Sequence, residues 1–187
     1  MRLLLHICCG PCALFPVHYL KEKGFEVYGY FYNPNIHPYA EFVKRLETLQ
    51  KWAMENDLQM IYNEEYKLEE YLQAVVYREK VRCRVCYSMR LRQAAQVARN
   101  GKFDYFTTTL LVSPFQDHEM IKSIGEAVGS EYGVPFYYAD YRPGFKEAVA
   151  ESKAAGMYRQ QYCGCIYSEM ERFYRPRKEE KGGRKNG

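Results

Sequence analysis

Short apolar segments alternate with amphipathic, helix-like segments along most of this chain. The apolar and aromatic segments predict strands at 3–7, 25–32, 60–62, 103–112 and 134–138. The periodic segments predict helices at 12–23, 38–56, 68–76, 87–99, 117–132 and 145–155. Strands separated by helices need crossover connections, which produce a mostly parallel sheet with helices on both faces. The alternation therefore predicts an α/β fold that is three-layered and Rossmann-like.

The length of 187 residues corresponds to about one globular domain. Charges balance over residues 1–174, whereas residues 175–187 carry an excess of positive charge. We therefore expect one domain over 1–174 and a basic C-terminal tail over 175–187. The tail suits contact with a polyanion such as RNA, and equally suits a solubilising terminus.

No apolar run approaches the roughly 20 residues that a membrane-spanning helix needs. The apolar start of the chain is too short for a signal peptide, and Cys8 and Cys9 interrupt it. We expect a soluble, cytoplasmic protein with no membrane partner.

Seven cysteines fall into three tight groups, which is unusual for a cytoplasmic chain. They are Cys8, Cys9 and Cys12, then Cys83 and Cys86, and finally Cys163 and Cys165. Reducing compartments do not maintain structural disulfides, so grouped cysteines there more often bind metal or perform redox chemistry. A free cysteine can also be buried simply as a small hydrophobic residue. That explanation suits cysteines scattered along a chain better than cysteines in tight groups. The grouping therefore predicts a metal or redox site.

The first two groups can supply four thiolates to one metal centre. Cys8 and Cys9 follow a predicted strand, so both can face one centre only if the pleat of the strand is broken there. Cys83 and Cys86 precede the predicted helix 87–99, whose N-terminus stabilises thiolates. Four thiolates are enough for an iron–sulfur cluster or for a tetrahedral zinc site, and both centres stay open at this point.

The third group, Cys163-Gly164-Cys165, has two interpretations. A disulfide between its cysteines closes a small, strained ring that is easily reduced, which suits catalysis rather than structure. Gly164 removes a Cβ atom from the tight turn that such a bridge needs. Alternatively, both thiols are further metal ligands.

Five motifs occur in a fixed order along the chain. They are His6-Ile7-Cys8-Cys9-Gly10-Pro11-Cys12, Tyr32-Asn33-Pro34-Asn35-Ile36-His37-Pro38, Cys83-Arg84-Val85-Cys86-Tyr87, Thr107-Thr108-Thr109-Leu110-Leu111-Val112-Ser113-Pro114 and Tyr162-Cys163-Gly164-Cys165-Ile166-Tyr167-Ser168. With these motifs the chain resembles the QueH family of epoxyqueuosine reductases, which carry out the last step of queuosine biosynthesis in tRNA. The resemblance covers nearly the whole chain and leaves out the basic tail.

The resemblance implies a fold like that of the nucleotide-binding HUP (PP-loop) proteins, in agreement with the α/β prediction. It also implies a [4Fe-4S] cluster, whose ligands in the matching motifs are Cys8, Cys9, Cys83 and Cys86. A redox-active disulfide between Cys163 and Cys165 is implied as well. Cys12 has no assigned part: it is a candidate ligand of a second metal, such as an additional iron ion, or it lines the site. Residues 8–13 replace the Ser-Gly-Gly-x-Asp-Ser loop of PP-loop ATPases, so ATP binding is not expected.

The implied reaction converts an epoxide to an alkene with two electrons and two protons, and it releases water. An iron–sulfur cluster transfers single electrons and a dithiol exchanges two, while a Lewis-acidic iron can polarise the epoxide oxygen. The electron donor is left unidentified. The acid that protonates the leaving oxygen has four candidates: Asp140, Asp117, His118 and His6. We take Asp140 as the catalytic candidate, although a cap, a turn or a core hydrogen bond also explains each of the four.

Basic residues surround the second cysteine pair and can meet tRNA phosphates. They are Arg82, Arg84, Arg90 and Arg92. A solvated helix face explains Arg90 and Arg92 as well. For His37 we favour a hydrogen bond within its loop over an approach to substrate.

Two other functions fit part of the pattern. A zinc-stabilised nucleic-acid-binding module without catalysis accounts for four thiolates but leaves the Cys-Gly-Cys motif unexplained. A thiol oxidoreductase or tRNA-thiolating enzyme of the PP-loop type needs an ATP-binding signature that the sequence does not show.

Overall fold

The structure is a computed structural model that describes residues 1–176. Residues 177–187, which hold most of the predicted basic tail, lie outside the described residues. The strands are β1 (Arg2–Ile7), β2 (Glu26–Phe31), β3 (Gln59–Tyr62) and β4 (Tyr105–Thr108). The α-helices are α1 (Gly10–Glu22), α2 (Tyr39–Glu55), α3 (Leu68–Val75), α4 (Arg82–Asn100), α5 (His118–Tyr132), α6 (Phe145–Ala154) and α7 (Ile166–Phe173), with short 3-10 turns η1 (Glu79–Val81), η2 (Thr109–Val112) and η3 (Arg142–Gly144). Within residues 1–176, no helix is long and apolar enough to cross a membrane.

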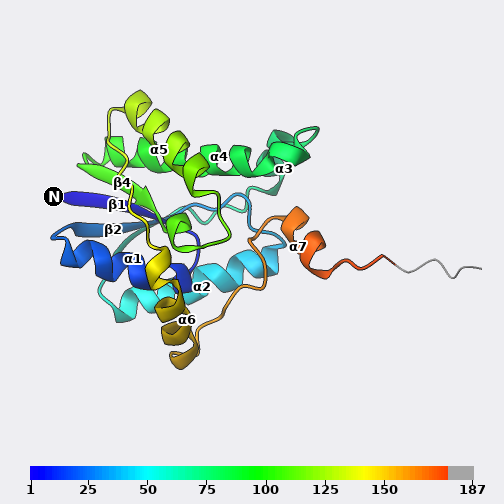
Figure 1. Cartoon of the computed structure of the whole chain (residues 1–187), viewed down its shortest axis with the longest axis horizontal. Helices are drawn as coiled ribbons and strands as arrows, with labels where there is room; N and C mark the ends of the chain where they lie inside the picture. The colour runs from blue at the N-terminus through cyan, green and yellow to red at the C-terminus, as the bar shows by residue number, and fades with distance from the viewer. Residues whose placement is uncertain (177–187) are drawn as a thin grey trace, which may run out of the picture.

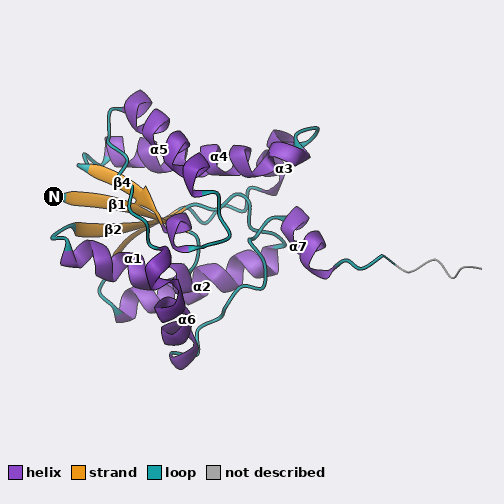
Figure 2. Cartoon of the chain, in the orientation of Figure 1, coloured by secondary structure: helices purple, strands orange, loops and turns teal. Residues whose placement is uncertain are grey.

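The four strands form one parallel sheet in the order β3-β2-β1-β4. Figure 2 shows β2, β1 and β4 side by side. Because β1 is central, side chains on both of its faces are buried. Leu3 and Leu5 pack in the core beneath α1 and α2, and Leu4 packs in the core beneath α4. Helices α1, α2 and α6 cover one face of the sheet, and α4 and α5 cover the other (Figure 1). The predicted α/β fold with helices on both faces of a parallel sheet is confirmed.

The order of the strands reverses beside β1. The chain runs outward from β1 to β2 and β3, and it then places β4 on the opposite side of β1. In open α/β sheets, ligands bind in the crevice at the carboxyl ends of the strands that flank such a reversal. Cys8 follows β1 and Thr109 follows β4, and the Cys8 amide donates to Thr109 Oγ1 at 3.2 Å. The first cysteine motif and the threonine motif therefore meet at this crevice.

Two predicted strands are shorter in the structure. The strand predicted over 103–112 ends at Thr108, because the Thr108 hydroxyl accepts a hydrogen bond from the Leu110 amide and the chain turns into η2. The segment 134–138 pairs with β4 through a single bridge, between Phe106 and Phe136. Pro135 has no amide hydrogen to donate, which limits longer pairing.

Two helices also differ from the prediction. The helix predicted over 87–99 begins earlier, at Arg82, so Cys83 and Cys86 lie in its first turns rather than before it. No Gly or Pro interrupts residues 82–86, so nothing in the sequence stops the helix there. Helix α7 is not predicted at all, and its N-cap is Cys165, whose sulfur accepts a hydrogen bond from the Ser168 amide.

Candidate active site and metal centre

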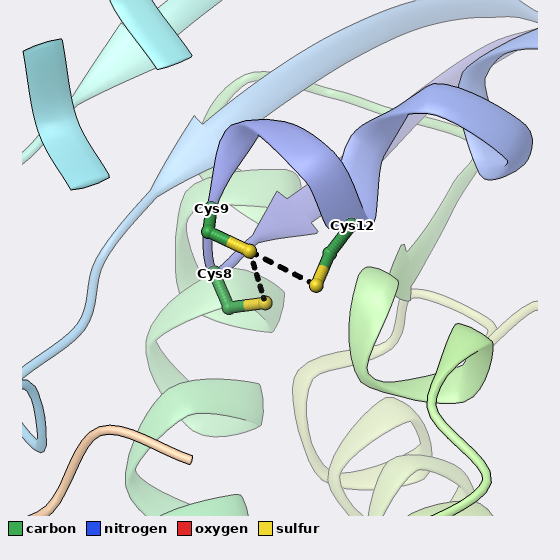
Figure 3. A group of neighbouring side chains, drawn as sticks. All are labelled: Cys8, Cys9 and Cys12. Carbon is green, nitrogen blue, oxygen red and sulfur yellow. Dashed lines mark hydrogen bonds between the residues drawn. The ribbon is translucent and has the colours of Figure 1, made fainter. Parts of the chain in front are cut away.

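Cys8, Cys9 and Cys12 bring their sulfur atoms together directly after β1 (Figure 3). The Sγ atoms of Cys8 and Cys9 are 3.7 Å apart, and those of Cys9 and Cys12 are 2.9 Å apart. Cys8 lies in a bend, and Cys9 is the extended N-cap of α1, so the pleat of β1 is broken where the two cysteines meet. The next residue is Gly10, where a Cβ atom would lie 2.7 Å from Met157 Cε. The start of α1 is thus closely packed against Met157.

The three sulfurs lie within 4.8 Å of one another, a spacing that suits one metal centre. Hydrogen bonding with Cys12 and Cys9 lowers the pKa of Cys8 well below its usual value, and Arg90 lowers it further. Burial raises the pKa of Cys9. Buried thiolates are soft ligands, which favour zinc or iron–sulfur clusters over hard cations such as Mg²⁺.

A cavity of about 400 Å³ opens beside this cysteine group. Cys8 and Cys12 line it from the crevice, Phe145 and Ser152 line it from α6, and Cys163 lines it from the loop before α7. The cavity thus brings together thiols from the first and third motifs. Its volume lies in the usual range for small-molecule sites.

The charge of the cavity lining is positive. Arg45, Arg90 and Arg159 line the cavity, and none of the described residues that line it is an Asp or a Glu. The carboxylate of Glu41 partly offsets this charge, because it accepts a hydrogen bond from Arg45 Nε at 2.7 Å. Such a cavity favours anionic ligands.

Arg90 is buried among the three motifs, with only 1% of its surface exposed. Its guanidinium donates to Asn33 Oδ1 at 2.8 Å and lies 3.8 Å from Cys86 Sγ. Burial alone would lower the pKa of Arg90, but the nearby Cys86, Cys8 and Cys163 raise it. One thiol from each cysteine motif therefore lies close to this single cation.

This burial corrects both predictions for Arg90, which is neither exposed to RNA phosphates nor part of a solvated helix face. Arg92 is half exposed and pairs with Glu131, and Arg82 pairs with Glu171. Arg84 is exposed.

The two cysteines of the second pair both lie on α4, but they differ in solvent exposure. Cys86 is buried in a small cluster with Tyr71, Val75 and Cys165, and burial raises the pKa of Cys86 to about 12. Cys83 is exposed. The group of closely spaced thiols consists of Cys8, Cys9 and Cys12 and includes neither Cys83 nor Cys86. The assignment of Cys8, Cys9, Cys83 and Cys86 as the four cluster ligands therefore stays a prediction.

The Cys-Gly-Cys motif carries two free thiols with different surroundings. Cys163 lines the cavity, and its Sγ lies 3.7 Å from Gln116 Nε2. Cys165 is buried and caps α7. Gly164 has φ of 142°, a backbone conformation that side chains rarely adopt, so glycine is required between the two cysteines.

Arg45 holds the Cys-Gly-Cys loop in place, a role that the sequence analysis missed. Its Nη1 and Nη2 donate to the carbonyls of Cys163 and Tyr162 at 2.9 and 3.0 Å. The His37 amide donates to the Gly164 carbonyl at 2.9 Å. One signal was available in the sequence: Glu41 and Arg45 lie four residues apart on the face of α2 that otherwise carries apolar residues.

None of the four proton-donor candidates lines the cavity. Asp140 is exposed and accepts hydrogen bonds from Arg142, which lower its pKa to about 2. Asp117 caps α5 through the Met120 amide, as a cap was expected there. The choice of Asp140 is therefore not supported by its position or its charge state.

His6, His118 and His37 form hydrogen bonds within the protein through their ring nitrogens, and none of them lines the cavity. His6 is fully buried between Thr108 Oγ1 and the Tyr32 carbonyl, and burial together with Arg90 lowers its pKa to about 3. His118 Nε2 lies 3.2 Å from the Ser113 carbonyl. His37 Nε2 lies 3.0 Å from the Pro34 carbonyl, which confirms the predicted hydrogen bond within its loop.

A family model described as epoxyqueuosine reductase QueH matches residues 3–171, which include all three cysteine motifs. The chain belongs to the QueH family of epoxyqueuosine reductases. The relatives named epoxyqueuosine reductase QueH include a protein of Dehalococcoides mccartyi that is 42% identical over 94% of this chain and 96% of its own. A Thermotoga maritima relative is 38% identical over 90% of this chain and 91% of its own. As a QueH protein the chain is an oxidoreductase of queuosine biosynthesis, and the resemblance seen in its motifs is confirmed.

The fold of this QueH protein also resembles a solved structure of low sequence identity. A predicted subunit of tRNA methyltransferase from Methanocaldococcus jannaschii matches with a TM-score of 0.53 and 11% identity, over 82% of this chain and 74% of the other. This likeness concerns the fold alone.

Proposed function

We propose that the protein reduces the epoxide of epoxyqueuosine in tRNA to the alkene of queuosine. The reaction consumes two electrons and two protons, and the epoxide oxygen leaves as water. The observation that carries this proposal is the cavity where Cys8, Cys12 and Cys163 face the same space in a chain of this family. The second cavity, between α1 and α6, has no cysteine in its lining.

The proposed donor set fits a [4Fe-4S] cluster in its chemistry, because all four ligands are thiols, three of them are buried, and Arg90 lies close to Cys8 and Cys86. The residues proposed to hold the cluster are Cys8, Cys9, Cys83 and Cys86. Cys12 is the candidate ligand of an additional iron ion. When bound, the cluster supplies electrons one at a time.

We assign the two-electron chemistry to Cys163 and Cys165. Formation of a disulfide between the two thiols releases two electrons and two protons, which balances the reduction of one epoxide to one alkene and water. Arg45 positions the loop through the carbonyls of Tyr162 and Cys163. An external electron donor then returns the disulfide to the dithiol.

The proposed substrate is tRNA, which the positive cavity lining favours. We place the activity in one domain over 1–174, with the basic tail over 175–187 adding positive charge. The proposed compartment is the cytoplasm, where grouped thiols stay reduced.

The test is reduction of tRNA that carries epoxyqueuosine, under anaerobic conditions with a chemical one-electron reductant. Mass spectrometry of the digested tRNA should show conversion to queuosine, with loss of one oxygen atom. A protein that holds its metal centre and leaves the nucleoside unchanged would overturn the proposal.

A further inference from the structure

The loop between η2 and α5 presents an exposed aromatic side chain at the mouth of the cavity. Phe115 lines the cavity and is nevertheless 84% exposed, so it lies at the rim. Large apolar side chains at the mouth of a binding cavity are candidates for ligand contact.

The loop that carries Phe115 is well anchored. The Phe115 amide donates to Ser113 Oγ at 3.2 Å, and the Gln116 side chain accepts from the Tyr87 hydroxyl at 2.8 Å. Asp117, two residues further along, caps α5. The ring of Phe115 contacts Phe145 edge-on, at a centroid distance of 6.2 Å. A stacking partner therefore meets an aromatic ring on a fixed loop, which lowers the entropy cost of binding.

Arg159 adds a positive charge to the same cavity. Arg45 is paired with Glu41, and Arg90 is bonded to Asn33. In the part of the chain that the structure describes, no carboxylate lies within ion-pair distance of Arg159. Its guanidinium is thus available for an anionic ligand.

We propose that Phe115 and Arg159 form a subsite for the nucleotide that adjoins the substrate nucleoside in its RNA chain. Phe115 stacks on the base of this nucleotide, and Arg159 contacts its phosphate. The inference rests on the proposed function, because a nucleoside that enters the cavity as part of RNA leaves its neighbours at the rim. An aromatic ring and an unpaired arginine are the groups that recognise single-stranded nucleotides without reading sequence.

Equilibrium binding to the anaerobically purified protein tests the stacking contact. The probe is a fluorescent stem-loop RNA that carries epoxyqueuosine, used without reductant so that no turnover occurs. Phe115→Ala and Phe115→Leu should raise the Kd by roughly 5- to 100-fold, whereas Phe115→Trp should retain affinity. The matched control is Tyr77→Ala, because Tyr77 is 95% exposed and does not line the cavity.

Removing the base from the RNA identifies the partner of Phe115. The probe is prepared with an abasic residue on the 5′ or the 3′ side of the modified nucleoside. On one of these two RNAs, Phe115→Ala should cause no further loss of affinity. Arg159→Gln should reduce the slope of log Kd against log salt by about 0.7, while Phe115→Ala should leave the slope unchanged.

The outcomes separate the subsite from the proposed function. If the wild-type protein reduces the RNA and Phe115→Ala binds it as tightly as wild type, the subsite is wrong. The subsite is also wrong if Phe115→Leu binds like wild type, because the contact is then not aromatic stacking. If the wild-type protein binds the RNA more tightly than Phe115→Ala but does not reduce it when reductant is supplied, the proposed function is wrong and the subsite stands as an RNA contact.

Discussion

Arg45 and Arg90 place two buried positive charges beside the thiols, and each side chain is about 1% exposed. A buried cation is costly unless its hydrogen bonds are satisfied. Arg45 meets this condition through Glu41 and the carbonyls of Tyr162 and Cys163. At the scale of single residues, the site therefore depends on cations that fix the cysteine loops as well as on the cysteines.

Replacing Arg45 by Gln should lower the free energy of unfolding by roughly 3–5 kcal/mol, because the substitution leaves the buried Glu41 carboxylate without its cationic partner. Denaturant unfolding of the anaerobically purified protein measures this loss. Arg92→Gln is the control, since the half-exposed Arg92–Glu131 pair should be worth less than about 1 kcal/mol. An equal decrease in the free energy of unfolding in the two variants would contradict the structural role of Arg45.

Asp140→Asn should leave turnover of epoxyqueuosine tRNA at neutral pH unchanged, because Asp140 does not line the cavity. Arg142 lowers the pKa of Asp140 to about 2, below its usual value of 3.8. Its contribution to stability is thus present above about pH 4 and is lost as the pH falls toward 2. Comparing the unfolding of the variant and the wild type from pH 7 to pH 2 tests this, and a large loss of turnover would restore Asp140 as the proton donor.

At the scale of elements, the site is built where a strand or loop passes into a helix. Cys9 is the N-cap of α1, Cys83 and Cys86 lie in the first turns of α4, and Cys165 is the N-cap of α7. Helix N-termini favour negative charge, but burial outweighs this effect and raises the pKa of Cys9, Cys83 and Cys86. Each cysteine motif is therefore presented by a helix start.

The backbone amides of α7 should exchange hydrogen faster when a substitution removes the Cys165 cap. The helix has eight residues, and none of them is buried, so tertiary packing does little to hold it. Cys165→Ala should speed hydrogen exchange of the α7 amides by roughly two- to fivefold, and Cys165→Ser should keep wild-type exchange. Exchange that is equally slow in both variants would show that the sulfur cap does not stabilise α7.

The elements also show what could be predicted from sequence. Residue periodicity and the spacing of turns were enough for the order of β1 to β4 and α1 to α6, since those patterns are local, but they missed α7. The extent of the strand predicted over 103–112 was not predictable in this way. Its last residues are apolar and buried, but the bond from the Leu110 amide to Thr108 Oγ1 turns them into η2.

At the scale of the whole molecule, the parallel sheet brings residues far apart in sequence to one crevice. Cys8 and Thr109 meet because β1 and β4 are neighbours, although about a hundred residues separate them. The close grouping of Cys8, Cys9 and Cys12 was predictable, because these residues are neighbours in the sequence itself. The buried arginines were not, because Arg45 binds carbonyls more than a hundred residues away and Arg90 binds Asn33 across the fold.

The central claim is that this α/β chain uses its grouped cysteines to hold an iron–sulfur cluster beside the substrate cavity. Iron and sulfide analysis of anaerobically purified protein, together with its absorbance spectrum, tests this claim most directly. The account predicts about four iron and four sulfide per chain and a broad absorbance near 400 nm, with more iron if Cys12 holds an additional ion. A colourless protein with one zinc and no sulfide, even after anaerobic reconstitution, would contradict it.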